Sequence, residues 1–89
     1  MKLVIVWKEE SDRASEVREW LRDFEHDVGP SKIESIDPET REGDNFAETY
    51  DVVEYPTILA IDSNGKVLQM WRGVPMPQIE KVAYWASNE

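Results

Sequence analysis

Ser11 and His26 are the residues of this chain best suited to nucleophilic or acid–base chemistry. Ser11 lies where a helix is predicted to begin, and the positive end of a helix dipole favours an anion held there. His26 is the only histidine. It lies about 22 Å further along the same helix at the standard rise per residue, so the two side chains cannot meet. We therefore interpret Ser11 as a helix N-cap and His26 as a favourable contact at the helix C-terminus, and we assign no catalytic residue.

Thiol and metal chemistry are also disfavoured. The chain contains no cysteine, which excludes disulfides, iron–sulfur ligation and thiol–disulfide exchange. Acidic residues gather in one stretch, at Glu34, Asp37, Glu39, Glu42 and Asp44. This stretch lacks the ligand spacing of a calcium loop, and in so acidic a chain such clusters are usually solvated surface. We expect neither a metal nor a cofactor.

The composition predicts one globular domain, spanning residues 1–89. A chain of this length buries roughly 60 to 65% of its unfolded surface, and a hydrophobic content of 40% with four tryptophans supplies a core. The net charge of -9 repels phosphate backbones and anionic lipids, so we expect no nucleic-acid or membrane partner. The apolar run Leu3 to Trp7 is too short for a signal peptide or a membrane span. We expect a cytoplasmic protein.

The apolar periodicity and the turn residues predict an α/β domain with a mixed four-stranded sheet. The predicted order is a strand over Lys2–Trp7, a helix from Ser11 or Asp12 to about Asp27, a strand over Lys32–Ile36, a short helix from Gly43 or Asp44 to Tyr50, strands over Thr57–Ile61 and Lys66–Arg72, and a final helix from Pro77. The first helix presents a core stripe of Ala14, Val17, Leu21 and Phe24. Trp20 is adjacent to this stripe and is expected to be partly buried. The arrangement is a βαβ unit, a short helix, a β-hairpin and a C-terminal helix.

A proline at the start of the third strand, in the run Glu54-Tyr55-Pro56-Thr57, carries a family resemblance. With Lys8 after the first strand, it resembles the thioredoxin/glutaredoxin-like family, in which this proline is cis and faces a Cys-x-x-Cys motif. Here Ser11-Asp12-Arg13-Ala14 stands in place of that motif, so the chain resembles a cysteine-free member. The resemblance implies a thioredoxin-like fold without the family's redox reaction.

The resemblance leads to two main hypotheses of function. In the first, the domain is redox-inactive and binds a polypeptide partner or serves in assembly, because the residue before the cis-proline offers backbone groups to an extended segment. The expected binding residues are Lys8, Ser11, Asp12, Arg13, Tyr55, Pro56 and Thr57. In the alternative, a glutathione- or thiol-ligand-binding protein or enzyme uses Ser11. However, Gly73 is followed by Val74-Pro75-Met76 and not by the glycine and acidic pair with which many glutaredoxins hold glutathione. A homodimer formed through an apolar edge is a third possibility.

Overall fold

The computed structural model describes residues 2–86, which form a four-stranded sheet and three helices. In chain order the elements are β1 (Lys2–Val6), α1 (Ala14–Asp27), β2 (Glu34–Ile36), α2 (Arg41–Thr49), β3 (Thr57–Ile61), β4 (Val67–Arg72) and α3 (Ile79–Ala86). This is the predicted order of elements. Within residues 2–86 no helix is long and apolar enough to cross a membrane.

The sheet has the strand order β2-β1-β3-β4. β1 runs parallel to β2, as a βαβ unit requires, and antiparallel to β3. β3 and β4 form the predicted hairpin, whose turn contains Gly65 with a φ of 85°. The mixed sheet therefore combines a parallel half and an antiparallel half, with β1 and β3 at its centre.

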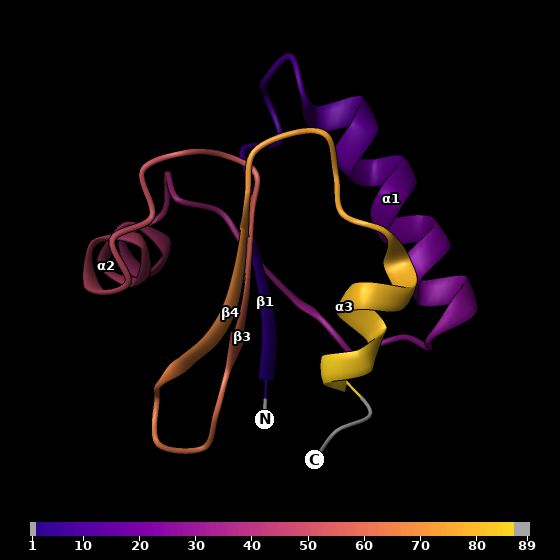
Figure 1. Cartoon of the computed structure of the whole chain (residues 1–89). Helices are drawn as coiled ribbons and strands as arrows, with labels where there is room; N and C mark the ends of the chain where they lie inside the picture. The colour runs from indigo at the N-terminus through magenta and orange to yellow at the C-terminus, as the bar shows by residue number, and fades with distance from the viewer. Residues whose placement is uncertain (1, 87–89) are drawn as a thin grey trace.

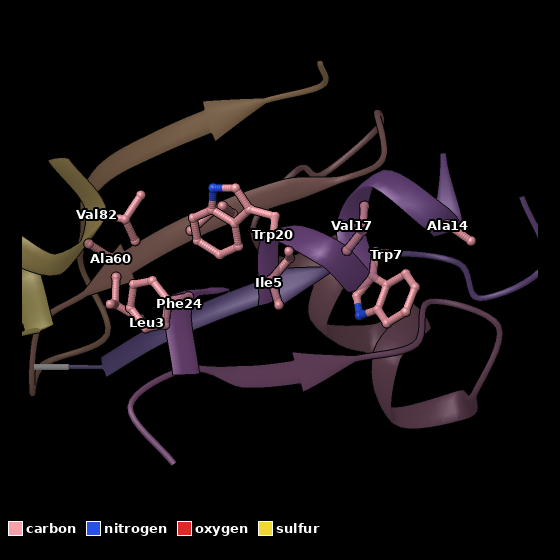
Figure 2. Packing of buried hydrophobic residues seen from close by; sticks show 10 residues of the cluster. Leu3, Ile5, Trp7, Ala14, Val17, Trp20, Phe24, Ala60 and Val82 are labelled. Atoms are coloured by element: carbon pink, nitrogen blue, oxygen red, sulfur yellow. The ribbon is translucent and has the colours of Figure 1, made fainter. Parts of the chain in front are cut away.

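Helices cover both faces of the sheet, with α1 and α3 on one side and α2 on the other (Figure 1). This explains why β1 and β3 are apolar at successive positions and not alternately. On the side of α1 and α3 the cluster consists of Leu3, Ile5, Trp7, Ala14, Val17, Trp20, Phe24, Ile58, Ala60 and Val82 (Figure 2). On the side of α2 it consists of Val4, Val6, Ala47, Val52, Leu59 and Ile61. Successive residues of each central strand enter opposite clusters.

The core stripe of α1 differs from the prediction. Trp20 is buried, with 8% of its surface exposed, and stacks on Phe24 with ring centroids 5.1 Å apart. Leu21 is only half-buried at the margin of the cluster. The indole Nε1–H of Trp20 donates to the carbonyl of Pro77 at 2.8 Å, which ties α1 to the segment before α3. Because that segment is close to α1 only after folding, the helical pattern alone could not select Trp20.

The ends of several elements also differ from the predicted ends. The first helix begins at Ala14, with Arg13 at the N-cap and no side-chain cap, so neither Ser11 nor Asp12 caps it. α2 begins at Arg41, where the Thr40 hydroxyl accepts a hydrogen bond from the N–H of Gly43 at 3.0 Å. The final helix begins at Ile79 and not at Pro77. Strand β2 begins at Glu34 and not at Lys32.

Candidate surface around Tyr55

Lys8 and Tyr55 come together at the end of the sheet where β1 ends and β3 begins. Lys8 follows the buried Trp7, and Tyr55 precedes β3 by two residues. The antiparallel register of the two strands pairs Val6 with Thr57, which brings the two loops side by side. The ammonium Nζ of Lys8 lies 5.2 Å from the centroid of the Tyr55 ring, within the range of a cation–π contact. The structure therefore unites two residues that the sequence placed in one site.

The loop between β1 and α1 is held by its own hydrogen bonds. The Ser11 hydroxyl donates to the carbonyl of Lys8 at 2.9 Å, and the N–H of Ala14 donates to the carbonyl of Ser11 at 3.1 Å. The Ser11 hydroxyl proton is thus directed at the protein backbone. This local bond replaces the N-cap that the sequence predicted for Ser11.

Arg18 also holds this loop, although no pattern in the sequence indicated such a role. The Arg18 guanidinium donates to the carbonyl of Glu9 at 3.0 Å and lies 5.6 Å from the centroid of the Trp7 ring. It therefore connects α1 to both ends of the loop segment 7–9. An arginine at an exposed helix position gives no sequence signal for such a role, because the path of the folded loop decides which carbonyl groups and rings lie within its reach.

The loop before β3 is fixed around Pro56. The Tyr55–Pro56 peptide bond is cis, Pro56 is buried, and its carbonyl accepts a hydrogen bond from the N–H of Gly73 at 2.7 Å. The hydroxyl of Thr57, which is 1% exposed, donates to the carbonyl of Glu54 at 2.5 Å. A second cis bond, Val74–Pro75, lies in the segment after β4 and was not predicted. These contacts join the Tyr55 loop to the end of β4.

This arrangement gives the backbone of Tyr55 no hydrogen-bond partner in the described part of the chain. Within residues 2–86 no hydrogen bond is made by its N–H or its carbonyl, although the neighbouring Glu54 and Pro56 carbonyls are both engaged. The Tyr55 side chain is half-buried beneath Lys8. An extended chain laid along this loop would find one donor and one acceptor together with an aromatic surface.

Glu54 and Gly73 form a close contact that the sequence did not indicate. A β-carbon on Gly73 would overlap the Glu54 carboxylate, and Gly73 has a φ of 68°. The exposed carboxylate of Glu54, the residue before Tyr55, therefore lies against the backbone of Gly73. Glu54 therefore adds a negative group to the loop that holds Tyr55.

Asp12 and Arg13 are exposed, and among the described residues no hydrogen bond or ion pair joins their side chains to Tyr55, Pro56 or Thr57. The predicted surface thus has a compact part, formed by Lys8, Ser11 and the Tyr55 loop. No group of three or more His, Cys, Asp or Glu side chains within residues 2–86 is placed to hold a metal ion.

Comparison with solved structures places the chain in a fold class. Thioredoxin 1 from the thermophilic eubacterium Thermosipho africanus TCF52B is similar over 96% of this chain and 89% of that chain, with a TM-score of 0.64 and 15% sequence identity. A designed protein is similar over 94% of this chain and 70% of that chain, with a TM-score of 0.60 and 24% identity. No family model matches the chain, and no curated protein matches it.

At these sequence identities the likeness shows the fold alone. The chain has a thioredoxin-like fold, and the predicted fold class is confirmed. It also has no cysteine, so it lacks the thiol chemistry that a Cys-x-x-Cys motif supplies.

Proposed function

We propose that this thioredoxin-like domain is redox-inactive and binds an extended segment of a polypeptide partner at the surface formed by Lys8, Ser11 to Arg13 and Tyr55 to Thr57. The observation that carries the proposal is that the backbone N–H and carbonyl of Tyr55 make no hydrogen bond within residues 2–86 and lie next to a ring that Lys8 covers. Backbone groups of this kind bind a strand without regard to its sequence, and the aromatic ring supplies contact area.

The hydrogen bond of Ser11 supports a polypeptide over a thiol ligand. To hold a glutathione thiolate, the Ser11 hydroxyl would have to donate its proton to sulfur. It donates to the Lys8 carbonyl instead, at 2.9 Å. Glu54 lies against Gly73, so an anionic ligand approaching that glycine would meet a carboxylate. Both observations weaken the alternative of a glutathione- or thiol-ligand-binding protein.

The charge of the domain favours neutral or basic segments. With a net charge of -9, the domain attracts basic partners over distances of about 10 Å at 0.1 M ionic strength. The association rate should therefore fall as salt rises, while the short-range contacts at Tyr55 change little.

The test is capture of partners from a cell lysate by the whole chain, with Tyr55→Ala and Arg13→Ala as separate variants. An aromatic residue central to an interface contributes more than about 1 kcal/mol, so Tyr55→Ala should lower affinity at least about fivefold. Tyr84→Ala is the matched control, because Tyr84 is 58% exposed on α3, away from the Tyr55 loop. Capture that neither variant of the surface reduces would contradict the proposal.

A parallel titration separates the two hypotheses. Glutathione is added to the isotopically labelled chain while the amide signals of Ser11, Tyr55 and Thr57 are followed. The polypeptide hypothesis predicts no saturable shift below millimolar concentrations. Saturable millimolar or tighter binding centred on Ser11 would favour the thiol-ligand alternative.

A further inference from the structure

Two depressions lie along α1 where it meets α3 and the segment before α3, and together we call them the α1–α3 groove. The first, of about 230 Å³, is lined by Glu16, Glu19, Trp20, Asp23 and Met76. The second, of about 450 Å³, is lined by Asp27, Val28, Gln78, Ile79, Glu80 and Ala83. Figure 1 shows α1 and α3 on the same side of the sheet, with the loop from β4 running down to α3 beside α1.

The floor of the groove is apolar and packs on the core of the domain. Val28, Met76, Ile79 and Ala83 are partly exposed and pack against the buried cluster beneath them. Trp20 belongs to that cluster, and its indole N–H is bonded to the Pro77 carbonyl at 2.8 Å, which holds the two walls together. Partly exposed apolar side chains on a fixed backbone form a surface suited to apolar side chains of another molecule.

The rim of the groove is a row of carboxylates. Glu16, Glu19, Asp23 and Asp27 recur at intervals of three and four residues, so they lie along one side of α1 over roughly 16 Å at the helical rise. Glu80 adds a carboxylate from α3. Within residues 2–86 the ion pair of a lysine or arginine is Lys2 with Glu34, and Asp27 lies 3.2 Å from Nδ1 of His26, so the other carboxylates of the rim form no ion pair in this part of the chain.

We propose that the α1–α3 groove docks a basic amphipathic α-helix of a partner protein. Apolar side chains of that helix would lie on Ile79, Met76 and the exposed edge of Trp20, while its lysines and arginines would face the carboxylates of α1. Basic residues three and four positions apart on a helix share one face, so their spacing matches that of the rim. This surface is separate from the Tyr55 surface, and the proposal does not depend on the proposed function.

A second copy of this chain does not fit the same groove. α1 is acidic along the groove, α2 carries Glu42, Asp44 and Glu48 against the single Arg41, and α3 carries one lysine and one glutamate. On α1 the basic residues Arg18, Arg22 and His26 recur every four positions, but Arg18 already contacts Glu9 and Trp7, and the same helix carries five carboxylates. Two copies with a net charge of -9 each also repel one another. Charge complementarity therefore selects a basic partner helix.

The test uses a synthetic helical peptide of leucine and lysine, with lysines at intervals of three and four and leucines on the adjoining face. It is titrated into the whole labelled chain, and the indole N–H of Trp20 and the amides of Ile79 and Ala83 are followed. In the double variant Glu19→Gln with Asp23→Asn, Kd should rise roughly three- to tenfold, because two exposed ion pairs are lost. The matched control, Asp44→Asn with Glu48→Gln, removes the same two charges from exposed positions of α2 and should change Kd less than about twofold.

Three results would overturn the proposal. Equal weakening in the two double variants would mean that only net charge matters. Shifts centred on the Tyr55 loop, or absent from Trp20 and Ile79, would place the peptide elsewhere. Equal binding of a peptide with the same composition but with central prolines, which prevent a helix, would show that the groove does not select a helical partner.

Discussion

Gly43 is expected to resist replacement by alanine, although alanine stabilises most helices. Gly43 lies in the first turn of α2 and is buried. A β-carbon there would overlap the carbonyl oxygen of Asp37 and lie 2.6 Å from its carbonyl carbon and 3.0 Å from Cγ2 of Ile36. Normal contact between carbon atoms needs about 3.5 Å or more and the carbonyl oxygen is closer still, so the helix and the segment before it must move apart by more than about 1 Å.

The free-energy change follows from three effects. Alanine in place of glycine favours the helix by about 1 kcal/mol. Overpacking opposes this by about 1 to 3 kcal/mol, and here the obstacle is backbone, which cannot rotate away. The movement also weakens the cap in which Thr40 accepts the N–H of Gly43 at 3.0 Å and donates to the Asp37 carbonyl at 2.8 Å, and a cap contributes about 1 kcal/mol. Gly43→Ala should therefore lower the free energy of unfolding by about 1 to 3 kcal/mol.

The assay is urea unfolding followed by tryptophan fluorescence. With an m-value of about 1 to 1.5 kcal/mol/M for a domain of this size, the midpoint should fall by roughly 0.7 to 3 M. Asn45→Ala is the control, because Asn45 is exposed on the same helix and should gain a few tenths of a kcal/mol from propensity. A Gly43→Ala protein that unfolds at the same or higher urea than the unmodified chain would refute the packing of α2 against Asp37.

Three further predictions concern single contacts. Thr57→Val removes the buried hydroxyl that donates to the Glu54 carbonyl, so it should lower the free energy of unfolding by about 1 kcal/mol and shift the amide signals of the Tyr55 loop. Unchanged signals in that loop would show that this hydrogen bond does not fix it. Trp20→Phe keeps an aromatic ring against Phe24 but removes the donor to Pro77, so it should lower the free energy of unfolding by about 1 to 2 kcal/mol, measured by urea unfolding. It should also speed amide exchange in α3, and unaltered exchange would mean that α3 is held without that bond. The backbone N–H of Lys66 donates to the Asp62 carboxylate, as does that of Asn64, and these bonds hold the pKa of Asp62 below its ordinary value. The charged carboxylate therefore stabilises the fold above about pH 4, and this contribution is lost as the pH falls through the folded-state pKa. Asp62→Asn should accordingly unfold at lower urea than the unmodified chain near neutral pH and at the same urea in strong acid; a difference that persists in acid would exclude the charge as its cause.

The order of strands and helices could be predicted from the sequence because each element depends on neighbouring residues. Leu3 to Val6 and Ile58 to Ile61 are continuous apolar runs, and a strand of that kind must be covered on both faces. Gly65 occupies the positive-φ position that the hairpin turn needs. The absence of cysteine excludes thiol chemistry by composition alone, whatever the fold.

The predicted surface around Tyr55 was only partly defined by the sequence. Lys8 and Tyr55 were both expected in it, but their stacking at 5.2 Å depends on the pairing of β1 with β3. Arg18 and Glu54 were missed, because an exposed charged residue gives no signal of the backbone that it will contact. Ser11 was expected to cap α1, but its hydroxyl donates to the Lys8 carbonyl, because the folded loop brings that carbonyl next to it.

Local periodicity, turn residues and composition were enough to predict the elements, their order and the absence of thiol chemistry, because none of these depends on contacts between distant residues. The packing of the assembled domain, in contrast, buries Trp20 in place of Leu21 and sets Gly43 against the backbone of Asp37. It also brings the indole of Trp20 to the carbonyl of Pro77, 57 positions away in the chain. Contacts between distant positions depend on how the layers pack on one another. That packing is fixed by shape and by hydrogen-bond partners that appear only when the sheet and helices are assembled.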